Sequence, residues 1–285
     1  MISAAGVVLH TFPEGNSVWG VTSLDNLLYV LRSKASQRIS VYDTDSYRLQ
    51  QRINVPQLDS MSDMTACAHY YCLYISDGDR YIHRAALPHT TITKWLMRGK
   101  PAYLSVTKAH TLLVTFDKLV MIREFTTHGG LLNEIDLLQD IMSPWHTIQL
   151  SSGEFIVCHY DDDDPVDLHR VCLVGSDGQV VKSFGGRQGS GSQQLTFPSH
   201  VAVDRDGFVF VADRDNLRVL LLSPLFTYVR EIMSREQPNW EPLRLFLDHD
   251  KRRLYVAENT TGDDDDDDDD DGGGRTAGRV VVISV

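Results

Sequence analysis

The chain has 285 residues, of which 42% are hydrophobic, and a formal net charge of −12. No apolar run reaches the roughly 18 residues that a membrane-spanning helix needs, and the start of the chain lacks the basic and apolar regions of a signal peptide. Aspartate runs at 161–164 and 263–271 account for the net negative charge, so the remainder is close to neutral. These features predict a cytoplasmic protein with no membrane partner.

The four cysteines are Cys67, Cys72, Cys158 and Cys172. They are too few and too irregularly spaced for a disulfide framework or a zinc signature. We therefore expect buried free thiols. Cys158 and Cys172 are expected on neighbouring strands, so a bridge between these two stays open.

A short strand pattern recurs six times along the chain, at intervals of 39 to 54 residues. Its copies are Tyr29-Val30, Tyr74-Ile75, Leu113-Val114, Ile156-Val157, Phe210-Val211 and Tyr255-Val256. A period in this range, filled with short β-rich segments, is typical of a propeller with four strands per blade. We predict an all-β, six-bladed β-propeller that forms a single domain over 1–285. Its blades are expected at about 17–55, 61–98, 101–138, 143–186, 195–232 and 241–285, the last completed by 6–11.

Taken in chain order, the first two blades are recognised mainly by their strand marks. The third has the shortest loop between its second and third strands, at about 116–118. The fifth is the clearest, with predicted strands at 197–204, 208–212, 218–222 and 228–232. Asp206-Gly207 supplies the positive-φ turn that a tight hairpin requires. The last blade has predicted strands at 243–248, 253–257 and 279–285 and lacks a fourth, which 6–11 would supply to close the ring and remove sheet edges.

The fifth blade and its approach carry a family pattern. Its marks are Phe184-Gly185-Gly186, Phe197-Pro198, Val201-Ala202-Val203-Asp204, Gly207, Val211-Ala212-Asp213 and Asn216-Leu217-Arg218-Val219. These residues resemble the NHL repeat, specifically over 184–232 and recognisably in 17–55, 143–186 and 241–285. The resemblance implies a six-bladed propeller similar to the C-terminal domain of tripartite-motif NHL proteins.

The first strand of each blade is expected to line the central channel. Counting back ten residues from each mark, or eleven in the last blade, gives the residue that opens each first strand: Trp19, Met64, Tyr103, His146, His200 and Arg244. One interpretation makes this set a ligand-binding rim, with flat aromatic contacts and Arg244 as an anion clamp. The other makes it a plug of packed side chains with satisfied polar tips.

A third interpretation makes His146 and His200 metal ligands. The peptide-amidating lyase resembles NHL propellers and holds its metal with channel histidines, but its third histidine has no counterpart here. The calcium-dependent lactonases are similar propellers with a ring of carboxylates and amides, which the predicted rim lacks. Two imidazoles leave a tetrahedral site short of ligands. We therefore expect no metal and no cofactor.

Loops between second and third strands emerge on the face where the first strands begin. The same-face loop residues are Asp161, Asp162, Asp163, Asp164, Arg214 and Arg218, and the run 263–271 lies in another such loop. Acidic loops bias the field over this mouth towards basic ligands. They oppose the cationic surface that a nucleic-acid backbone needs.

We predict a non-catalytic binding module for a protein or peptide, with a basic peptide as the best match. The resemblance implies the substrate-recognition end of a tripartite-motif-like ubiquitin ligase whose ligase activity lies outside this chain. RNA binding, which the same resemblance implies, ranks second. A metal-dependent lyase of the peptide-amidating type ranks third. The identity of the partner and the oligomeric state stay open.

Overall fold

The structure is a computed structural model that describes residues 6–32, 38–55, 58, 63–88, 91–116, 118–138, 141–161, 167–233, 239–260 and 277–285. Every regular element in these ranges is a β-strand. No segment within them forms a helix with the length and apolarity to cross a bilayer.

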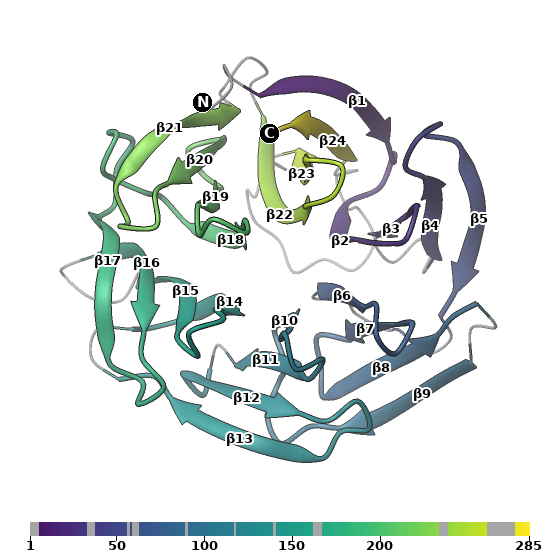
Figure 1. Ribbon diagram of the computed structural model, residues 1–285, viewed down its shortest axis with the longest axis horizontal. Helices are drawn as coiled ribbons and strands as arrows, with labels where there is room; N and C mark the ends of the chain where they lie inside the picture. The colour runs from purple at the N-terminus through teal and green to yellow at the C-terminus, as the bar shows by residue number, and fades with distance from the viewer. Residues whose placement is uncertain are drawn as a thin grey trace, which may run out of the picture.

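The described strands form six antiparallel sheets of four strands each, arranged around a central axis like the blades of a propeller (Figure 1). The first three sheets contain β2 (Val18–Leu24), β3 (Leu27–Arg32), β4 (Arg38–Asp43) and β5 (Leu49–Asn54); β6 (Asp63–Cys67), β7 (Cys72–Ser76), β8 (Tyr81–Ala86) and β9 (Thr91–Leu96); and β10 (Tyr103–Val106), β11 (Leu112–Phe116), β12 (Met121–Phe125) and β13 (Leu131–Asp136).

The other three sheets complete the ring. They contain β14 (Pro144–Gln149), β15 (Phe155–Tyr160), β16 (Leu168–Val174) and β17 (Val180–Arg187); β18 (Pro198–Val203), β19 (Val209–Asp213), β20 (Arg218–Leu222) and β21 (Tyr228–Met233); and β22 (Trp240–Asp248), β23 (Arg253–Thr260) and β24 (Gly278–Ser284) with β1 (Val7–Pro13). The predicted all-β six-bladed propeller is therefore confirmed.

The hydrophobic core lies between neighbouring blades. The inner strands β7, β11 and β19 are buried at every residue, because both faces of each strand are covered by adjacent sheets. Outer strands such as β5 and β13 are exposed at most positions. One cluster joins Leu31 of the first sheet to Ile75 of the second, and another joins Leu113 of the third to Val157 of the fourth. The propeller is thus held by wedge-shaped apolar layers between sheets.

The ring is closed by the N-terminal strand. β1 pairs with β24 from Val7↔Ser284 to Pro13↔Arg279, and Phe12 is buried in the layer next to the first sheet. Figure 1 shows β1 as the outer strand of the last blade. The predicted closure is confirmed, with the strand at Val7–Pro13 rather than 6–11.

The fifth sheet shows why the repeat pattern was readable. Asp204 Oδ1 accepts hydrogen bonds from the backbone N–H groups of Asp206 and Phe208, and Gly207 has a φ of 85°. An aspartate and a left-handed glycine thus build the turn between β18 and β19. The four strands begin and end within one or two residues of the predicted bounds.

The family-like Asp, Asn and Arg of this repeat form a buried network. Asp213 accepts hydrogen bonds from Arg218 Nε at 2.6 Å, from Asn216 Nδ2 at 2.9 Å and from the Thr196 backbone N–H at 2.7 Å. Arg218 also donates to the carbonyl groups of Ser190, Gly191 and Gln194. Together these contacts fix the connection that enters the blade, and the structure places Arg218 in the interior rather than on the surface.

Candidate active site at the mouth of the channel

The pairing of first and second strands decides which side chains meet at the channel. In the fifth and sixth blades, His200 pairs with Ala212 and Arg244 with Ala257. The same position is held by Gly20, Asp63 and Tyr103 in the first three blades, while His146 lies in a bulge opposite Cys158. Gly20 and Asp63 thus stand one residue away from Trp19 and Met64, which the fixed count selected. Turn lengths and bulges differ between blades, so a fixed count shifts the register by one residue.

Three of these side chains form a compact cluster in the channel. Asp63, His146 and His200 bring one potential ligand atom each to within 4.8 Å of one another. The two imidazole rings are stacked, with centroids 3.5 Å apart. Arg244 Nε lies 3.1 Å from Asp63 Oδ1, and the guanidinium lies over the Tyr103 ring at 4.8 Å. All but Tyr103 of these five residues are buried.

Hydrogen bonds tie this cluster to the backbone of neighbouring blades. Asp63 Oδ2 accepts from the Leu104 N–H at 2.8 Å. His146 Nδ1 accepts from Val201 N–H at 3.4 Å, and His200 Nδ1 from Leu245 N–H at 3.3 Å. Each side chain therefore links its own first strand to a first strand of the next blade. This arrangement matches the plug interpretation, because Asp63 and both Nδ1 atoms have hydrogen-bond partners inside the protein.

Burial sets the protonation states of the cluster. Burial lowers the pKa of His146 to about 3, with the Arg244 charge as a second cause, and the pKa of His200 also lies well below its ordinary value. Both imidazoles are therefore neutral near pH 7. Burial raises the pKa of Asp63 to about 6, against the lowering effect of Arg244.

The donor set looks like a metal site but does not fit one. Asp63 supplies the third ligand that the sequence interpretation lacked. However, both Nδ1 atoms accept N–H bonds, so each neutral ring carries its proton on Nε2 and has no lone pair there for a metal. Histidines that bind metals normally donate their second N–H instead. The Arg244 charge further disfavours a cation at this place.

Aromatic rings extend outward from the cluster to the mouth. Tyr103 stacks on Trp145 with centroids 5.2 Å apart, Trp145 meets Tyr160 at 5.4 Å, and Tyr160 meets Phe197 at 4.3 Å. All four are half-buried. We call this set the aromatic run. Arg244 lies over its inner ring, and Arg214 lies 6.0 Å from the centre of its outer ring, Phe197.

Ionisable groups stand at the outer end of the aromatic run, in the loop between β19 and β20. Arg214 Nε lies 2.8 Å from Glu241 Oε2 and 3.4 Å from Asp215 Oδ1. Burial raises the pKa of Asp215 to about 6; the Glu241 charge adds to this and Arg214 opposes it. Because the Asp215 side chain is still 34% exposed, a ligand at the mouth can reach its carboxyl group.

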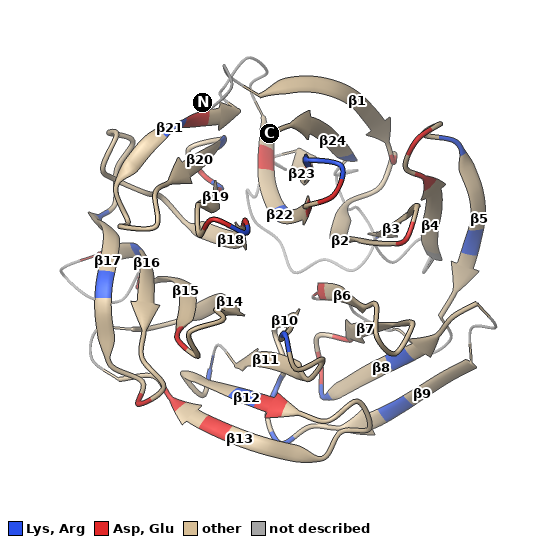
Figure 2. Ribbon diagram, viewed as in Figure 1, with Lys and Arg blue, Asp and Glu red and all other residues tan. Residues whose placement is uncertain are grey.

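The remaining loop residues contribute less. Asp161 is buried, and its N–H donates to the Leu168 carbonyl at 2.9 Å. Asp162, Asp163, Asp164 and the run 263–271 lie outside the described residues. Acidic and basic positions are interspersed around the drawn ring (Figure 2). The sequence interpretation missed Asp63, Asp215, Glu241 and the rings Trp145, Tyr160 and Phe197. The Pro144-Trp145-His146 repeat and the Arg214-Asp215 pair were the available signals.

The four cysteines are buried and free. Val157 pairs with Cys172, and Cys158 pairs with Val171. The bridge that stayed open between Cys158 and Cys172 is therefore not formed.

Solved structures show the same fold. A streptogramin B lyase matches with a TM-score of 0.64 and 13% identity, covering 98% of this chain and all of that one. The virginiamycin B lyase of Staphylococcus aureus matches with a TM-score of 0.63 and 10% identity, covering 97% and 98%. Its catalytically inactive histidine-to-alanine variant with quinupristin matches at 0.62 and 10%, covering 95% and 99%. No protein-family model matches the chain.

These findings correct the functional prediction. The chain was expected to be a non-catalytic binding module and not an enzyme, but propellers that match it over nearly their whole length are lyases. At 10 to 13% identity the shared feature is the propeller itself. The finer resemblance to the tripartite-motif NHL family is not confirmed, and nothing found supports the ubiquitin-ligase or RNA-binding roles.

Proposed function

We propose that the chain is an enzyme of the lyase type that acts by acid–base chemistry at the channel mouth. The observation that carries this proposal is the grouping of an accessible carboxyl group, Asp215, with Arg214 and Glu241 at the outer end of the aromatic run. The pKa of Asp215 is raised to about 6. A general base works best when its pKa lies near the working pH. A perturbed carboxyl group beside polar and aromatic side chains is a reasoned candidate for that role.

We infer that the reaction is an elimination. Asp215 would take a proton from a carbon next to a carbonyl group, the electron pair of that C–H bond would form a double bond, and the leaving group would depart with its bonding electrons. The nearby Arg214 would stabilise negative charge on the carbonyl oxygen. Its contacts to Glu241 and Asp215 use Nε, and a guanidinium has further N–H donors for a ligand.

The aromatic run supplies the binding surface. Its half-buried rings offer apolar contact area beside the reacting groups. His169 helps to hold the outer end, because Nδ1 accepts from the Phe197 N–H at 2.9 Å and Nε2 lies 2.9 Å from Asp167 Oδ1. We infer a ligand with an apolar or aromatic portion attached to an ester or amide carbonyl.

The similar lyases suggest the first substrate class to test. The inactive variant of the S. aureus virginiamycin B lyase was solved with quinupristin. Purified protein should be incubated with quinupristin and the loss of parent compound followed by mass spectrometry. Asp215→Asn should lower kcat by about 10²- to 10⁴-fold, as loss of a general base does.

The matched control is Arg205→Gln, an exposed charge at the opposite end of the same blade. It should leave turnover unchanged. If the wild-type protein leaves quinupristin intact, this substrate class is wrong. If Asp215→Asn turns over at the wild-type rate with an unchanged melting temperature, the assignment of the base is wrong.

We also propose that the repeats themselves are of the NHL type. Support comes from the Asp213–Asn216–Arg218 network, which gives the residues shared with that pattern a common structural role. Finding the same carboxylate-to-arginine contact in NHL structures, at the same blade position, would test this proposal.

A further inference from the structure

A recess lies away from the channel mouth, between the fifth and sixth blades. It has a volume of about 460 Å³, within the range of small-molecule sites. Its rim includes the turns that join β18 to β19 and β22 to β23. Those turns stand at the strand ends opposite to Asp215 and Glu241, so this recess is separate from the candidate active site.

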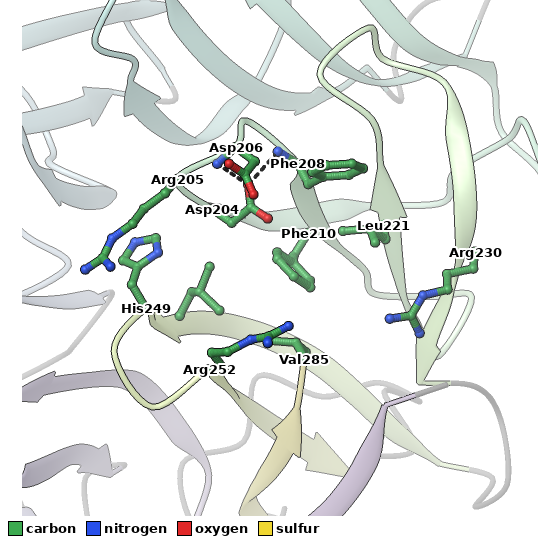
Figure 3. A pocket seen from close by; sticks show the side chains of 11 residues that line it. Asp204, Arg205, Asp206, Phe208, Phe210, Leu221, Arg230, His249, Arg252 and Val285 are labelled. Carbon is green, nitrogen blue, oxygen red and sulfur yellow. Dashed lines mark hydrogen bonds between the residues drawn. The ribbon is translucent and has the colours of Figure 1, made fainter. Parts of the chain in front are cut away.

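The walls are aromatic and aliphatic. Phe210 and Leu221 come from the fifth sheet and Leu247 from the sixth, and all three belong to the apolar layer between these blades. Phe208 stands at the upper edge in Figure 3. The recess is therefore a gap in the apolar layer between the blades, and the apolar part of a ligand can pack against its walls.

A guanidinium with two unpaired nitrogen atoms faces this gap. Arg230 of β21 pairs with Leu221 across the sheet, and its side chain lines the recess. Its Nε and Nη1 atoms are buried and have no hydrogen-bond partner among the described residues. Leaving buried charged donors unpaired is costly, and native proteins rarely do so without a reason. A ligand that supplies acceptor atoms is such a reason.

The other charges of the recess favour an anion as well. Arg252 reaches in from the β22–β23 turn, below Phe210 (Figure 3). Burial and the Arg205 charge lower the pKa of His249, which favours its neutral form. The two lining side-chain carboxylates are Asp204 and Asp206, and Asp204 Oδ1 is already held by its own turn.

We propose that this recess binds a small amphipathic anion: an aromatic or aliphatic body with one carboxylate or phosphate group. The body would lie against Phe210 and Leu221, and the anionic group would accept hydrogen bonds from Arg230 and Arg252. An arginine fork matches both carboxylate and phosphate oxygens.

The test uses calorimetric titration of the full chain with 3-phenylpropionate, phenyl phosphate and the neutral 3-phenylpropionamide. At least one anion should bind saturably, and the amide should bind about tenfold more weakly or worse, as expected for loss of charged hydrogen bonds. Whichever of the two anions binds more tightly identifies the headgroup. Equal affinity for the acid and the amide would overturn the proposal, as would no binding of either anion at millimolar concentration.

Variants locate the site. Arg230→Met should weaken the binding of that anion by about tenfold or more, and Arg252→Met should weaken it in the same direction. Arg48→Met is the matched control: it removes an exposed arginine of the first blade that does not line the recess, so affinity should be nearly unchanged. Unchanged affinity in both Arg230→Met and Arg252→Met refutes the assignment.

The unliganded variant gives a second readout. Arg230→Met removes the unpaired donors and fills the gap with an apolar chain, so its melting temperature without ligand should rise above the wild-type value. Gain of stability with loss of binding is the signature of a side chain kept for a ligand. A fall in melting temperature with unchanged binding would instead show a structural role for Arg230.

Discussion

Arg244 and Asp63 form a buried ion pair across the channel, with 3.1 Å between Nε and Oδ1, although 181 residues separate them in the chain. The pair joins β22 of the sixth sheet to β6 of the second and so passes over the first sheet. Both side chains are nearly inaccessible, at 3% and 2% exposure. This buried ion pair therefore holds together two blades that are not neighbours in the ring.

Breaking the Arg244–Asp63 ion pair should destabilise the protein. Arg244→Ala leaves the Asp63 carboxyl group buried without its partner, which costs about 3–5 kcal/mol of unfolding free energy. Urea denaturation at pH 7.5 measures this loss. Arg205→Ala, which breaks an exposed pair, should cost less than about 1 kcal/mol. If Arg244→Ala left the urea midpoint unchanged but abolished the binding of quinupristin, the result would support the rim interpretation instead.

Removal of the N-terminal strand should damage the whole ring. Deleting residues 1–12 takes away most of β1, including the buried Phe12, and leaves β24 as an open edge. We expect a large cooperative fall in melting temperature and a tendency to aggregate, measured by circular dichroism and light scattering. Deleting residues 1–5 is the control and should change little, because β1 begins at Val7. Equal melting curves for both deletions would argue against closure.

The buried histidines predict the pH dependence of stability. Their pKa values are lowered in the folded state, His146 to about 3, so below pH 6.5 the unfolded chain binds protons that the folded chain does not. The contribution of these histidines to stability is therefore complete above about pH 6.5 and is lost progressively towards pH 3, by about 1.4 kcal/mol per pH unit for each such histidine. His146→Gln should reduce the slope of unfolding free energy against pH by about that amount. An unchanged slope would mean that His146 titrates normally.

The proposed base predicts the pH dependence of turnover. Asp215 must be deprotonated to act, so kcat/KM should rise through about pH 6 and reach a plateau above it. The Glu241 charge is one cause of the raised pKa, so Glu241→Gln should move this acidic limb to lower pH. A purely structural role for Glu241 would lower activity without moving the limb. Turnover of a quinupristin-type substrate across pH 4 to 8 distinguishes these outcomes.

Metal ions should leave the channel cluster unaffected. With both Nδ1 atoms accepting backbone hydrogen bonds, Asp63, His146 and His200 offer no ready site for zinc. A metal that bound the folded state would raise the melting temperature with concentration. Scans with micromolar zinc or with EDTA should therefore coincide with the untreated scan. A dose-dependent rise that His200→Ala abolishes would show that the rings exchange their protons for a metal.

The scaffold was predictable because its signals are local. Alternating apolar residues, the Asp206-Gly207 turn and the recurring strand marks each depend on neighbours within one hairpin, and a repeat multiplies such signals. Closure by β1 was predictable for a related reason: the last blade was visibly one strand short, and an open edge is unfavourable.

The site was less predictable because it depends on register and on distant contacts. Asp63 escaped notice because the β6–β7 hairpin differs in length from the β18–β19 hairpin, so a fixed count selected Met64. Asp215 drew no attention because its shifted pKa arises from burial and from Glu241, which is brought near only by the packing of two blades. The spacing of residues along the chain does not reveal that Asp215 and Glu241 lie close together.

The antiparallel pairing of β1 with β24 also decides how the ring would respond to mechanical load. Val7 lies opposite Ser284, so the first and last described residues leave the sheet at the same end of the strand pair. Tension applied between them would load the hydrogen bonds one after another, as in opening a zipper, rather than all together in shear. The other blades carry no such load until this pair has separated. A propeller tethered at both ends would therefore open first between β1 and β24, and at low force. This would hold even if its core resists heat and urea well.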